Sequence, residues 1–333
     1  MSDQNRQILL RRRPQGLLAP DDVELVTSPM PELHEGEALA RNLYLGMEAA
    51  MRNWLTGSEG GYMEPVAIGD VVKGSSVSEI VETRCDAYEV GDIVTSLGNW
   101  QDYVVCQDDI LTTKVARDVE PQRYLSLYSS AGVTAFLGME LGAPNEGDTV
   151  LVSAAAGGTG SIAGQIARIM GAGRVVGIAG SDEKCTAAVE QFGFDSCINY
   201  KAGDLKAQLK DHCPKRVDVY FDNVGGDILD VVLGGIAPRA RVVLCGAIAS
   251  YLEGKLPGPR NYTNLMSREA TMTGFITFNH WDRFEEIFGR LRGWADDGRI
   301  RVREAVFDGL ERCPDALNSI FTGGNIGKAM VKL

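Results

Sequence analysis

The chain contains 333 residues, 44% of them hydrophobic and 23% charged, which is the composition of an ordinary globular protein with room for two domains. Its net charge of −12 argues against nucleic acid or an anionic membrane surface as a partner, because both attract basic proteins. No apolar run approaches the roughly 18 residues of a membrane span, and the polar beginning MSDQNRQ is unlike a signal peptide, so we expect a cytoplasmic protein.

The first 120 residues have the pattern of a β-rich domain. Short β-type runs such as RQILLRR, EALARNLYL and WQDYVVC are separated at close intervals by Gly, Pro and Asp. This spacing favours a partly closed antiparallel β-structure. Residues 299–333 return to the same mixed pattern, and we expect them to belong to this domain.

Residues 121–298 have a different pattern, in which apolar strands alternate with helices. The expected strands are TVLVSAA, RVVGIAG, SCINY, VDVYFDNV, RVVLCGA and TMTGFITF. Such alternation specifies a parallel sheet covered by helices on both faces. The predicted fold class is α/β, with a nucleotide-binding domain of residues 121–298 inserted into a discontinuous β-rich domain of residues 1–120 and 299–333. The last strand should form an edge that pairs with a second copy, so we expect a homodimer.

A glycine-rich turn follows the strand DTVLVSA. Ala155, Gly157 and Gly160 fit the dinucleotide fingerprint, with Ala in place of the first Gly. Small residues here let the backbone approach a pyrophosphate, and the next helix directs its first N–H groups at the phosphates. Because the fingerprint stands between a strand and a helix, it predicts a dinucleotide site.

The next strand, Val175–Ile178, ends without the carboxylate that holds the adenosine ribose in many NAD sites. Ser181 lies 21 positions after Gly160, about where that acid would be, and Lys184 follows it. A carboxylate would repel a 2′-phosphate, whereas Ser and Lys donate hydrogen bonds and positive charge to one. The sequence therefore predicts NADP(H) rather than NAD(H) as the cofactor.

A family resemblance is carried by six segments: SAAAGGTGSIAGQIA, VVGIAGSDEKC, INYK, YFDNVGG, VVLCGAIASY and GNIGKAMVKL. The chain resembles the zinc-independent medium-chain dehydrogenase/reductase superfamily, and within it the prostaglandin reductase/leukotriene B4 dehydrogenase group with its curcumin reductase-like members. The resemblance covers nearly the whole chain. It implies a GroES-like β-rich domain around a Rossmann domain, a dimer, and NADPH-dependent reduction of the carbon–carbon double bond of hydrophobic α,β-unsaturated ketones or aldehydes.

The resemblance also assigns residues to the cofactor. Ser181 and Lys184 correspond to the side of the 2′-phosphate, and Tyr200 to a tyrosine near the cofactor phosphates. Further cofactor contacts are implied at Ala156, Gly157, Gly158, Thr159, Gly160, Asn223, Cys245, Gly246, Ala247, Tyr251, Phe275, Phe278 and Asn325.

The cysteines and histidines show no metal-ligand spacing. None of the seven cysteines forms a CxxC pair, and His34, His212 and His280 are scattered. The sequence predicts reduced thiols and no metal site.

Without a metal, the enolate oxygen formed by hydride addition must be met by hydrogen-bond donors. The resemblance implies Tyr62, in GGYMEPV, and Tyr251, in ASYLEG, as the catalytic donors. Relatives commonly read DPYMR where this chain reads EAAMR, so Ala50 stands in place of a tyrosine. Phe278 stands where several relatives have another tyrosine, and His280 is an alternative proton source.

Three other functions stay open. The same scaffold could serve a quinone or carbonyl reductase. The lost hydroxyls at Ala50 and Phe278 motivate two more readings: an oxidoreductase or oxygenase that acts on aryl-alkenes, and a non-catalytic NADP(H)-binding sensor.

Overall fold

The chain forms two compact units in a computed structural model that describes residues 4–57, 63–252 and 258–333. Unit 1 comprises Met1–Leu125 and Glu304–Leu333, and unit 2 comprises Ser126–Arg303. The two boundaries fall at residues 125 and 303, compared with 120 and 298 in the sequence-based division. In the described ranges no helix has both the length and the apolar character needed to cross a membrane.

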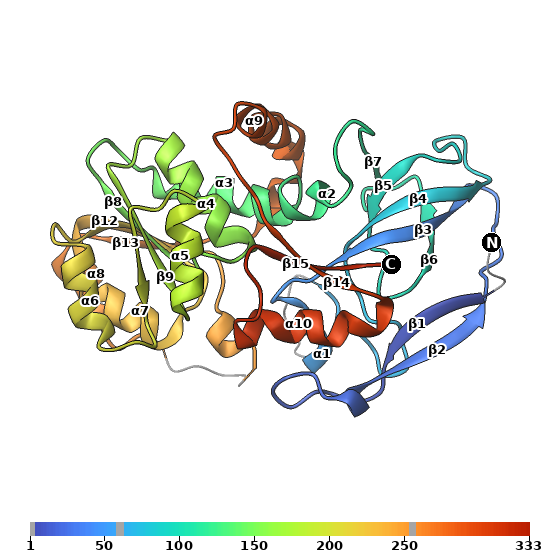
Figure 1. The fold of residues 1–333 in the computed structure, drawn as a ribbon, viewed down its shortest axis with the longest axis horizontal. Coiled ribbons are helices and arrows are strands. Elements are labelled where there is room, and N and C mark those ends of the chain that lie inside the picture. The colour runs from blue at the N-terminus through green and yellow to red at the C-terminus, as the bar shows by residue number, and fades with distance from the viewer. Residues whose placement is uncertain (1–3, 58–62, 253–257) are drawn as a thin grey trace. The chain divides into compact units, whose positions relative to one another are not determined.

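Unit 1 is mainly a β-structure (Figure 1). Its larger sheet has the order β14-β15-β3-β4-β5-β7, with β6 also paired to β3, and β1 and β2 form a separate antiparallel pair. The strands are β1 (Gln4–Leu10), β2 (Val23–Pro29), β3 (Glu37–Gly46), β4 (Ser76–Thr83), β5 (Ile93–Ser96), β6 (Tyr103–Gln107), β7 (Thr113–Lys114), β14 (Glu304–Asp308) and β15 (Lys328–Lys332). The helices are α1 (Met51–Thr56), α2 (Arg123–Ser126, which crosses the unit boundary) and α10 (Cys313–Thr322), with 3-10 turns at Pro20–Asp22 and Leu310–Arg312.

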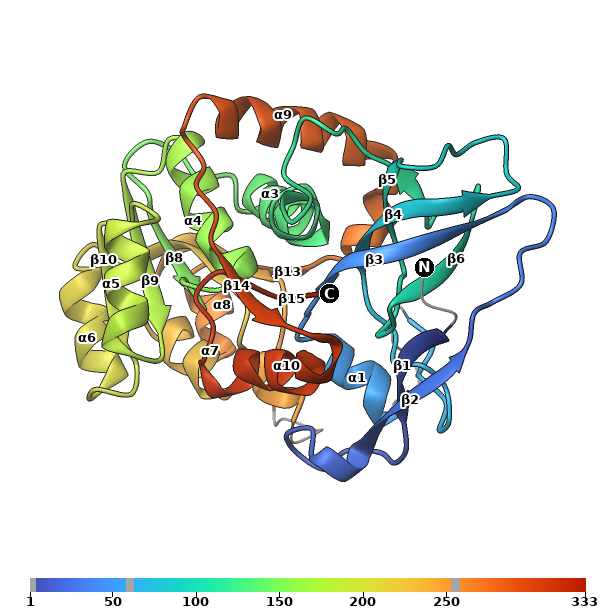
Figure 2. The ribbon, with the colours of Figure 1, turned by 45° about the vertical axis from the view of Figure 1, so that its right-hand side comes forward.

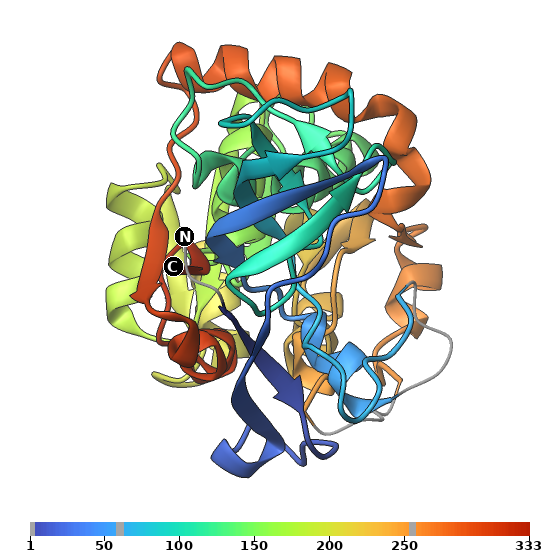
Figure 3. The ribbon, with the colours of Figure 1, turned by 90° about the vertical axis from the view of Figure 1, so that its right-hand side faces the viewer.

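The C-terminal segment is part of unit 1 because β15 pairs antiparallel with β3, placing Val331 opposite Leu45. Both of these side chains are fully buried, in one apolar core with Leu10, Trp100 and Leu317. Residues from the two ends of the chain therefore share one core, which explains the discontinuous unit. The 3-10 turn before α10 contacts β1, and in Figure 3 the red α10 lies beside the blue β1–β2 pair.

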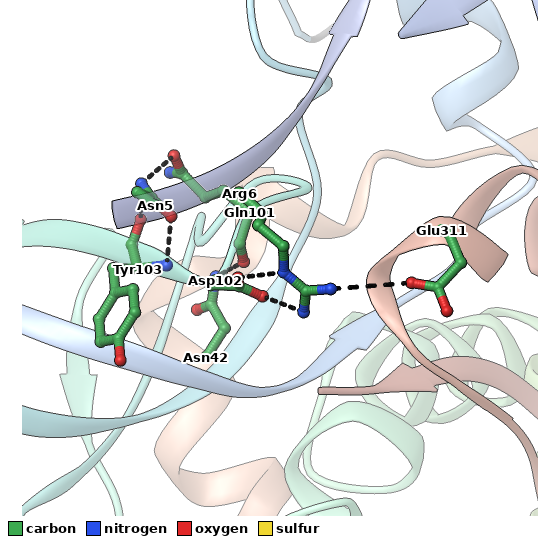
Figure 4. A network of polar contacts seen from close by, with 7 residues as sticks. All are labelled: Asn5, Arg6, Asn42, Gln101, Asp102, Tyr103 and Glu311. Atoms are coloured by element: carbon green, nitrogen blue, oxygen red, sulfur yellow. Dashed lines mark hydrogen bonds and ion pairs between the residues drawn. The ribbon is translucent and has the colours of Figure 1, made fainter. Parts of the chain in front are cut away.

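A polar network joins β1 to the segment that leads into β6 (Figure 4). The buried Asn5 side chain donates to the carbonyl of Tyr103 at 3.0 Å and accepts from its N–H at 2.9 Å. Beside it, the Arg6 guanidinium donates to both carboxylate oxygens of Asp102, at 2.7 and 3.0 Å. Asn42, on β3, donates to the carbonyl of Gln101 at 2.7 Å. Because an amide matches both backbone groups of Tyr103, Asn5 attaches β1 as an extra backbone pairing would.

Unit 2 contains a six-stranded parallel sheet with the order β10-β9-β8-β11-β12-β13. The strands are β8 (Thr149–Ser153), β9 (Arg174–Ala179), β10 (Ser196–Asn199), β11 (Val217–Asp222), β12 (Ile236–Leu244) and β13 (Thr271–Gly274). Numbered from β8, the order is 3-2-1-4-5-6, which is that of the Rossmann fold. The central strand β8 is buried at every residue, as expected for a strand covered on both faces.

Helices cover both faces of this sheet (Figures 1 and 2). They are α3 (Ser130–Gly142), α4 (Gly158–Ile169), α5 (Asp182–Glu190), α6 (Leu205–His212), α7 (Gly226–Leu233), α8 (Thr263–Ser267) and α9 (Phe284–Asp296), with 3-10 segments at Ile248–Ser250 and Thr277–Arg283. Leu209 of α6 and Val232 of α7 share a buried cluster with Leu151 of β8 and Val176 of β9. The predicted fold class, a β-rich part combined with a doubly wound parallel sheet, is confirmed.

The last strand of the sheet is shorter than the sequence pattern predicted. β13 is at the edge of the sheet, as expected, but it ends at Gly274 and a 3-10 segment begins at Thr277, so the prediction of a strand through Phe278 was wrong. The ring of Phe278 packs 6.2 Å from the ring of Trp281 and 6.5 Å from that of Phe284. These contacts between residues three to six positions apart require a turn rather than an extended strand.

Candidate functional site

The first part of the site is the turn between β8 and α4. It contains Ala156 and then Gly157, which caps the helix that begins at Gly158. A Cβ on Gly160 would collide with the carbonyl oxygen of Ala154, so the helix approaches the strand this closely only with glycine there. The first N–H groups of a helix have no partner within the helix and can bind an anion. The predicted residues from Ala156 to Gly160 therefore form the turn after the central strand β8 and the start of α4.

This turn lies at the point where the strand order reverses, between β8 and β11. In open α/β sheets, ligands bind outside the carboxyl ends of the strands at such a point. The adjoining residue after β11 is Asn223, whose side chain donates to the carbonyl of Ser153 at 2.7 Å. The N–H of Asn223 donates to the hydroxyl of Ser153 at 2.8 Å. Asn223 is thus attached to the end of β8 by two bonds.

A buried carboxylate accepts several hydrogen bonds at the same carboxyl ends of β8 and β11. Asp222, the last residue of β11, accepts hydrogen bonds from the hydroxyl of Ser153 at 3.1 Å and of Tyr220 at 2.7 Å. It also accepts from the N–H groups of Val224 and Gly225, each at 3.0 Å. Burial raises the pKa of Tyr220 well above its usual value, so this phenol stays a donor. Neither Asp222 nor Ser153 was among the residues predicted from the sequence; the available signal for Asp222 is its place directly before Asn223 in DNVGG.

The segment after β12 lies against the turn after β11. The N–H groups of Cys245 and Gly246 donate to the carbonyl of Asp222 at 2.9 and 3.0 Å. The N–H of Ala247 donates to the phenol oxygen of Tyr251 at 3.2 Å. Burial is the main cause that raises the pKa of Tyr251, so its hydroxyl keeps its proton. Burial also raises the pKa of the Cys245 thiol, which is therefore not a thiolate.

A second cluster lies where β9 and β10 end. The hydroxyl of Ser181 accepts from the N–H of Lys184 at 3.2 Å and so caps α5, and it still has its own O–H to donate. A Cβ on Gly180 would lie 3.2 Å from the ring of Tyr200 and 3.5 Å from Cε of Lys201. The side chains of Tyr200 and Lys201 therefore lie over the turn that carries Ser181.

Two lysines, Lys184 and Lys201, belong to this cluster. The pKa of Lys184 is lowered, first by partial burial and then by the positive charge of Lys201. Asp182, the first residue of α5, accepts from the side chain of Asn199 at 2.7 Å. Lys201 follows Tyr200 directly in INYK but was not selected from the sequence, because nothing local shows that it lies beside Lys184.

Comparisons with known proteins match nearly the whole chain. Residues 6–114 match a family described as the N-terminal domain of oxidoreductase, and residues 158–292 match one described as zinc-binding dehydrogenase. The chain is 35% identical to the NADPH-dependent curcumin reductase of Escherichia coli, over 99% of this chain and 97% of that protein. It is 33% identical to the NADP⁺-dependent 2-alkenal reductase of Nicotiana tabacum, over 98% of this chain and 97% of that protein. The chain belongs to the zinc-independent double-bond reductase group of the medium-chain dehydrogenase/reductases.

The fold agrees with this membership. A crystal structure of CurA from Vibrio vulnificus in complex with NADPH has a TM-score of 0.93 with this chain. The two sequences are 36% identical, and the match covers 98% of each chain. The family resemblance stated from the sequence motifs is therefore confirmed.

The second family description mentions zinc, so we searched the described residues for a set of zinc ligands. Among the described residues of this medium-chain dehydrogenase/reductase, no three His, Cys, Asp or Glu side chains are grouped as metal ligands. The seven cysteines are all free thiols. The polar groups at the sheet edge of unit 2 include hydroxyls, an amide, backbone N–H groups and the Asp222 carboxylate.

The remaining predicted residues of this medium-chain dehydrogenase/reductase lie elsewhere. Asn325 is in unit 1, between α10 and β15, where its buried side chain donates to the carbonyl of Gly327 at 2.8 Å. Phe275 and Phe278 lie beyond the end of β13, in unit 2. Tyr62 lies outside the described residues. Unit 2 by itself therefore brings together the phosphate turn, Asn223, the 245–251 segment and the Ser181–Lys184–Tyr200 cluster.

The EAAMR element, residues 48–52, is a structural part of unit 1. Ala50 packs against the main apolar core of that unit, and Arg52 is almost fully buried. Arg52 donates to the carbonyls of Pro14 and Gly16, each at 2.8 Å, and its burial lowers its pKa. Glu48 accepts from Lys328 at 2.7 Å and from Ser75 at 3.0 Å. These contacts attach the element to both ends of the chain.

Proposed function

We propose that this chain is an NADPH-dependent reductase of the carbon–carbon double bond of hydrophobic α,β-unsaturated ketones or aldehydes. The observation that carries the proposal is the set of groups at the carboxyl ends of the strands of unit 2. A glycine-rich turn suited to a pyrophosphate and the protonated phenol of Tyr251 occur in one domain with the cluster that contains Lys184 and Lys201. The 35% and 33% identities to a curcumin reductase and a 2-alkenal reductase support the substrate class.

The residues of unit 2 fit NADP(H). The turn Ala156–Gly160 would hold the pyrophosphate against the N-terminus of α4, since glycine there keeps the backbone close to the strand. Ser181, Lys184, Tyr200 and Lys201 would hold the 2′-phosphate through two cations and two hydroxyls. Asn223 and the segment Cys245–Ala247 lie on the nicotinamide side. When bound, the cofactor supplies the hydride.

The protein supplies orientation and hydrogen-bond donors. Reduction of an enone builds negative charge on the carbonyl oxygen, and a preorganised donor stabilises that charge. The phenol oxygen of Tyr251 accepts from the N–H of Ala247, which leaves its O–H to donate, and its raised pKa keeps that proton in place. We assign Tyr251 as the main donor and Tyr62 as a second donor from unit 1.

We assign a separate role to each unit. We assign unit 1 as the GroES-like substrate domain, which contributes Tyr62 and Asn325, and unit 2 as the cofactor domain. We further propose a cytoplasmic homodimer that binds no nucleic acid and no membrane. The net charge of −12 and the position of β13 at the edge of its sheet support this assignment.

A panel of acceptors tests the activity. Pure protein is incubated with NADPH and an enone, an enal, a quinone or an aryl-alkene, and the products are identified by mass spectrometry. We expect the saturated ketone or aldehyde, heavier by two hydrogens and with its carbonyl intact. Cofactor deuterated on the transferred position should place one deuterium on the β-carbon.

Other outcomes select the other functions. An allylic alcohol would indicate a carbonyl reductase, and reduction of the quinone alone would indicate a quinone reductase. An oxygenated aryl-alkene product would indicate oxygen chemistry. Tight NADPH binding without turnover of any acceptor would indicate a sensor.

A further inference from the structure

Two thiols lie against each other beside the 2′-phosphate cluster. Cys185 is in α5 and Cys197 is in β10, and their Sγ atoms are 2.7 Å apart. Both residues are partly exposed. In the sheet, Cys197 is paired with Gly177 of β9, and a Cβ added to that glycine would lie 3.1 Å from the Cys197 sulfur. Glycine at this position leaves room for the thiol to face α5.

Cys185 differs from the buried cysteines in its acidity. Burial raises the pKa of Cys106 and Cys245, and that of Cys213 to about 12, which makes these thiols poor nucleophiles at neutral pH. The pKa of Cys185 is lowered, chiefly because the thiol of Cys197 can donate a hydrogen bond to its thiolate. The pKa of Cys197 is correspondingly raised. Cys185 is therefore the stronger nucleophile of the pair, and Cys197 is placed to react second.

We propose that Cys185 and Cys197 form a reversible disulfide when the protein meets a hydroperoxide. The thiolate of Cys185 attacks the terminal peroxide oxygen and the O–O bond breaks, which leaves a sulfenic acid on Cys185. The departing alkoxide or hydroxide takes up the proton that the Cys185 thiol had released and leaves as an alcohol or water. Cys197 then attacks that sulfur, the S–S bond forms, and the hydroxide released takes the Cys197 proton as water. In total, two thiols lose two electrons and two protons to the peroxide. A dithiol reductant reverses the reaction.

The geometry requires little movement. A covalent S–S bond is about 2.0 Å long, so the sulfur atoms must approach by about 0.7 Å from their separation of 2.7 Å. The bond fixes α5 to β10 at this point, and each of the two elements carries one side of the 2′-phosphate cluster. Lys184 precedes Cys185 in α5, and Tyr200 follows β10.

The disulfide therefore weakens NADPH binding, a part of the inference that rests on the proposed cofactor site. A site built from Lys184 on one element and Tyr200 and Lys201 after the other loses its fit when the two elements shift. We expect a rise in the Kd of NADPH of about fivefold or more, within the usual range of coupling between sites. The Kd of NADH should change less, because NADH has no 2′-phosphate to place.

Peptide mapping tests the disulfide without using the cofactor. The reduced protein is treated with hydrogen peroxide, its remaining thiols are blocked with iodoacetamide, and the digest is analysed by mass spectrometry. We expect a linked peptide pair containing Cys185 and Cys197, lost in C185S and in C197S, kept in C85S and reversed by dithiothreitol. Alkylation of both thiols after peroxide treatment, or a sulfinic acid on Cys185 without the link, overturns the proposal. The C197A variant should also lack the linked peptide pair. The melting temperatures of C197A, the serine variants and the wild type are compared, so that loss of the link in a misfolded variant is recognised.

Cofactor titration tests the coupling. NADPH and NADH are titrated into reduced and oxidised wild type and into peroxide-treated C197S. A rise in the NADPH Kd in the oxidised wild type alone supports the coupling, and equal NADPH Kd values in the two wild-type forms overturn it. Weak NADPH binding by the reduced wild type would contradict the proposed cofactor site instead, and the mapped disulfide would stand.

Discussion

The hydroxyl of Ser153 donates a 3.1 Å hydrogen bond to the buried carboxylate of Asp222. The two residues end β8 and β11, the neighbouring strands at which the order of the sheet reverses. Because the same carboxylate accepts from the N–H groups of Val224 and Gly225, it holds the turn that positions Asn223. One buried side chain therefore connects the phosphate turn to the proposed nicotinamide side.

Replacing Asp222 with Asn should destabilise unit 2. The four donors all bond Oδ1 of Asp222, so an amide oxygen there can keep them but without the full negative charge. The NH₂ group would replace Oδ2, which accepts from the N–H of Gly225 at 3.2 Å, and the two donors would then face each other. We expect a cost of about 1–3 kcal/mol in the free energy of unfolding. Denaturant unfolding measures this loss. Ser153→Ala removes one of the hydroxyl donors and also the acceptor of the Asn223 N–H, so it should cost about 1–3 kcal/mol. An unchanged unfolding free energy in Asp222→Asn would show that the network does not stabilise this edge.

Replacing Lys184 with Glu should weaken NADPH much more than NADH. A charge-assisted hydrogen bond contributes about 1.5–3 kcal/mol to binding. Because about 1.4 kcal/mol of binding free energy corresponds to a tenfold change in Kd, losing this bond should raise the Kd of NADPH by about tenfold or more. Fluorescence titration with both cofactors measures the ratio. Lys206→Glu, the same charge change at an exposed position of α6, is the matched control. Equal losses for the two cofactors would rule out contact with the 2′-phosphate.

Lys201→Ala should also reduce the preference for NADPH, by less than Lys184→Glu because a charge is removed rather than reversed. The same change should raise the pKa of Lys184, since the charge of Lys201 helps to lower it. NMR titration of the lysine side chains with the cofactor absent follows that pKa. If the pKa of Lys184 does not move, the two ammonium groups do not interact.

Tyr251→Phe should lower turnover by about 10²–10³, the usual effect of losing one preorganised donor, with little change in NADPH affinity. Tyr62→Phe should have a milder effect, mainly on substrate binding. Because the pKa of Tyr251 is raised, wild-type activity should show no alkaline loss from this phenol below its usual pKa of about 10. Steady-state kinetics across pH tests both statements. Wild-type turnover in Tyr251→Phe would exclude its assigned role and direct attention to His280.

Light scattering at micromolar concentration should show a dimer that depends on β13. Gly274, at the end of this edge strand, is exposed, and an added Cβ would meet nothing within 4 Å in the chain. Gly274→Arg should leave the folded chain intact and block pairing with a second copy. Gly289→Arg, at an equally open and exposed glycine of α9, is the control. A strictly monomeric wild-type protein would contradict the proposed dimer.

The sequence alone determined the features that depend on neighbours along the chain. The turn from Ala156 to Gly160 was recognisable because strand, small residues and helix follow one another within a few positions. Ser181 was recognisable at the start of α5 for the same reason, and it does cap that helix. Alternating apolar strands and helices predicted the parallel sheet, since the hydrophobic period of each element is local.

Only the tertiary structure decided which distant side chains meet. Ser153 and Asp222 are 69 positions apart in the chain, and the five elements α4, β9, α5, β10 and α6 lie between their strands. They meet because β8 and β11 are neighbours in the sheet. The pairing of β10 with β9 brings Lys201 beside Lys184 and Cys197 beside Cys185. The end of β13 at Gly274 was likewise decided by packing, because the aromatic contacts of Phe278 outweigh the β-type pattern of its segment. Strand order and register bring such groups together, and neither has a local signal in the sequence.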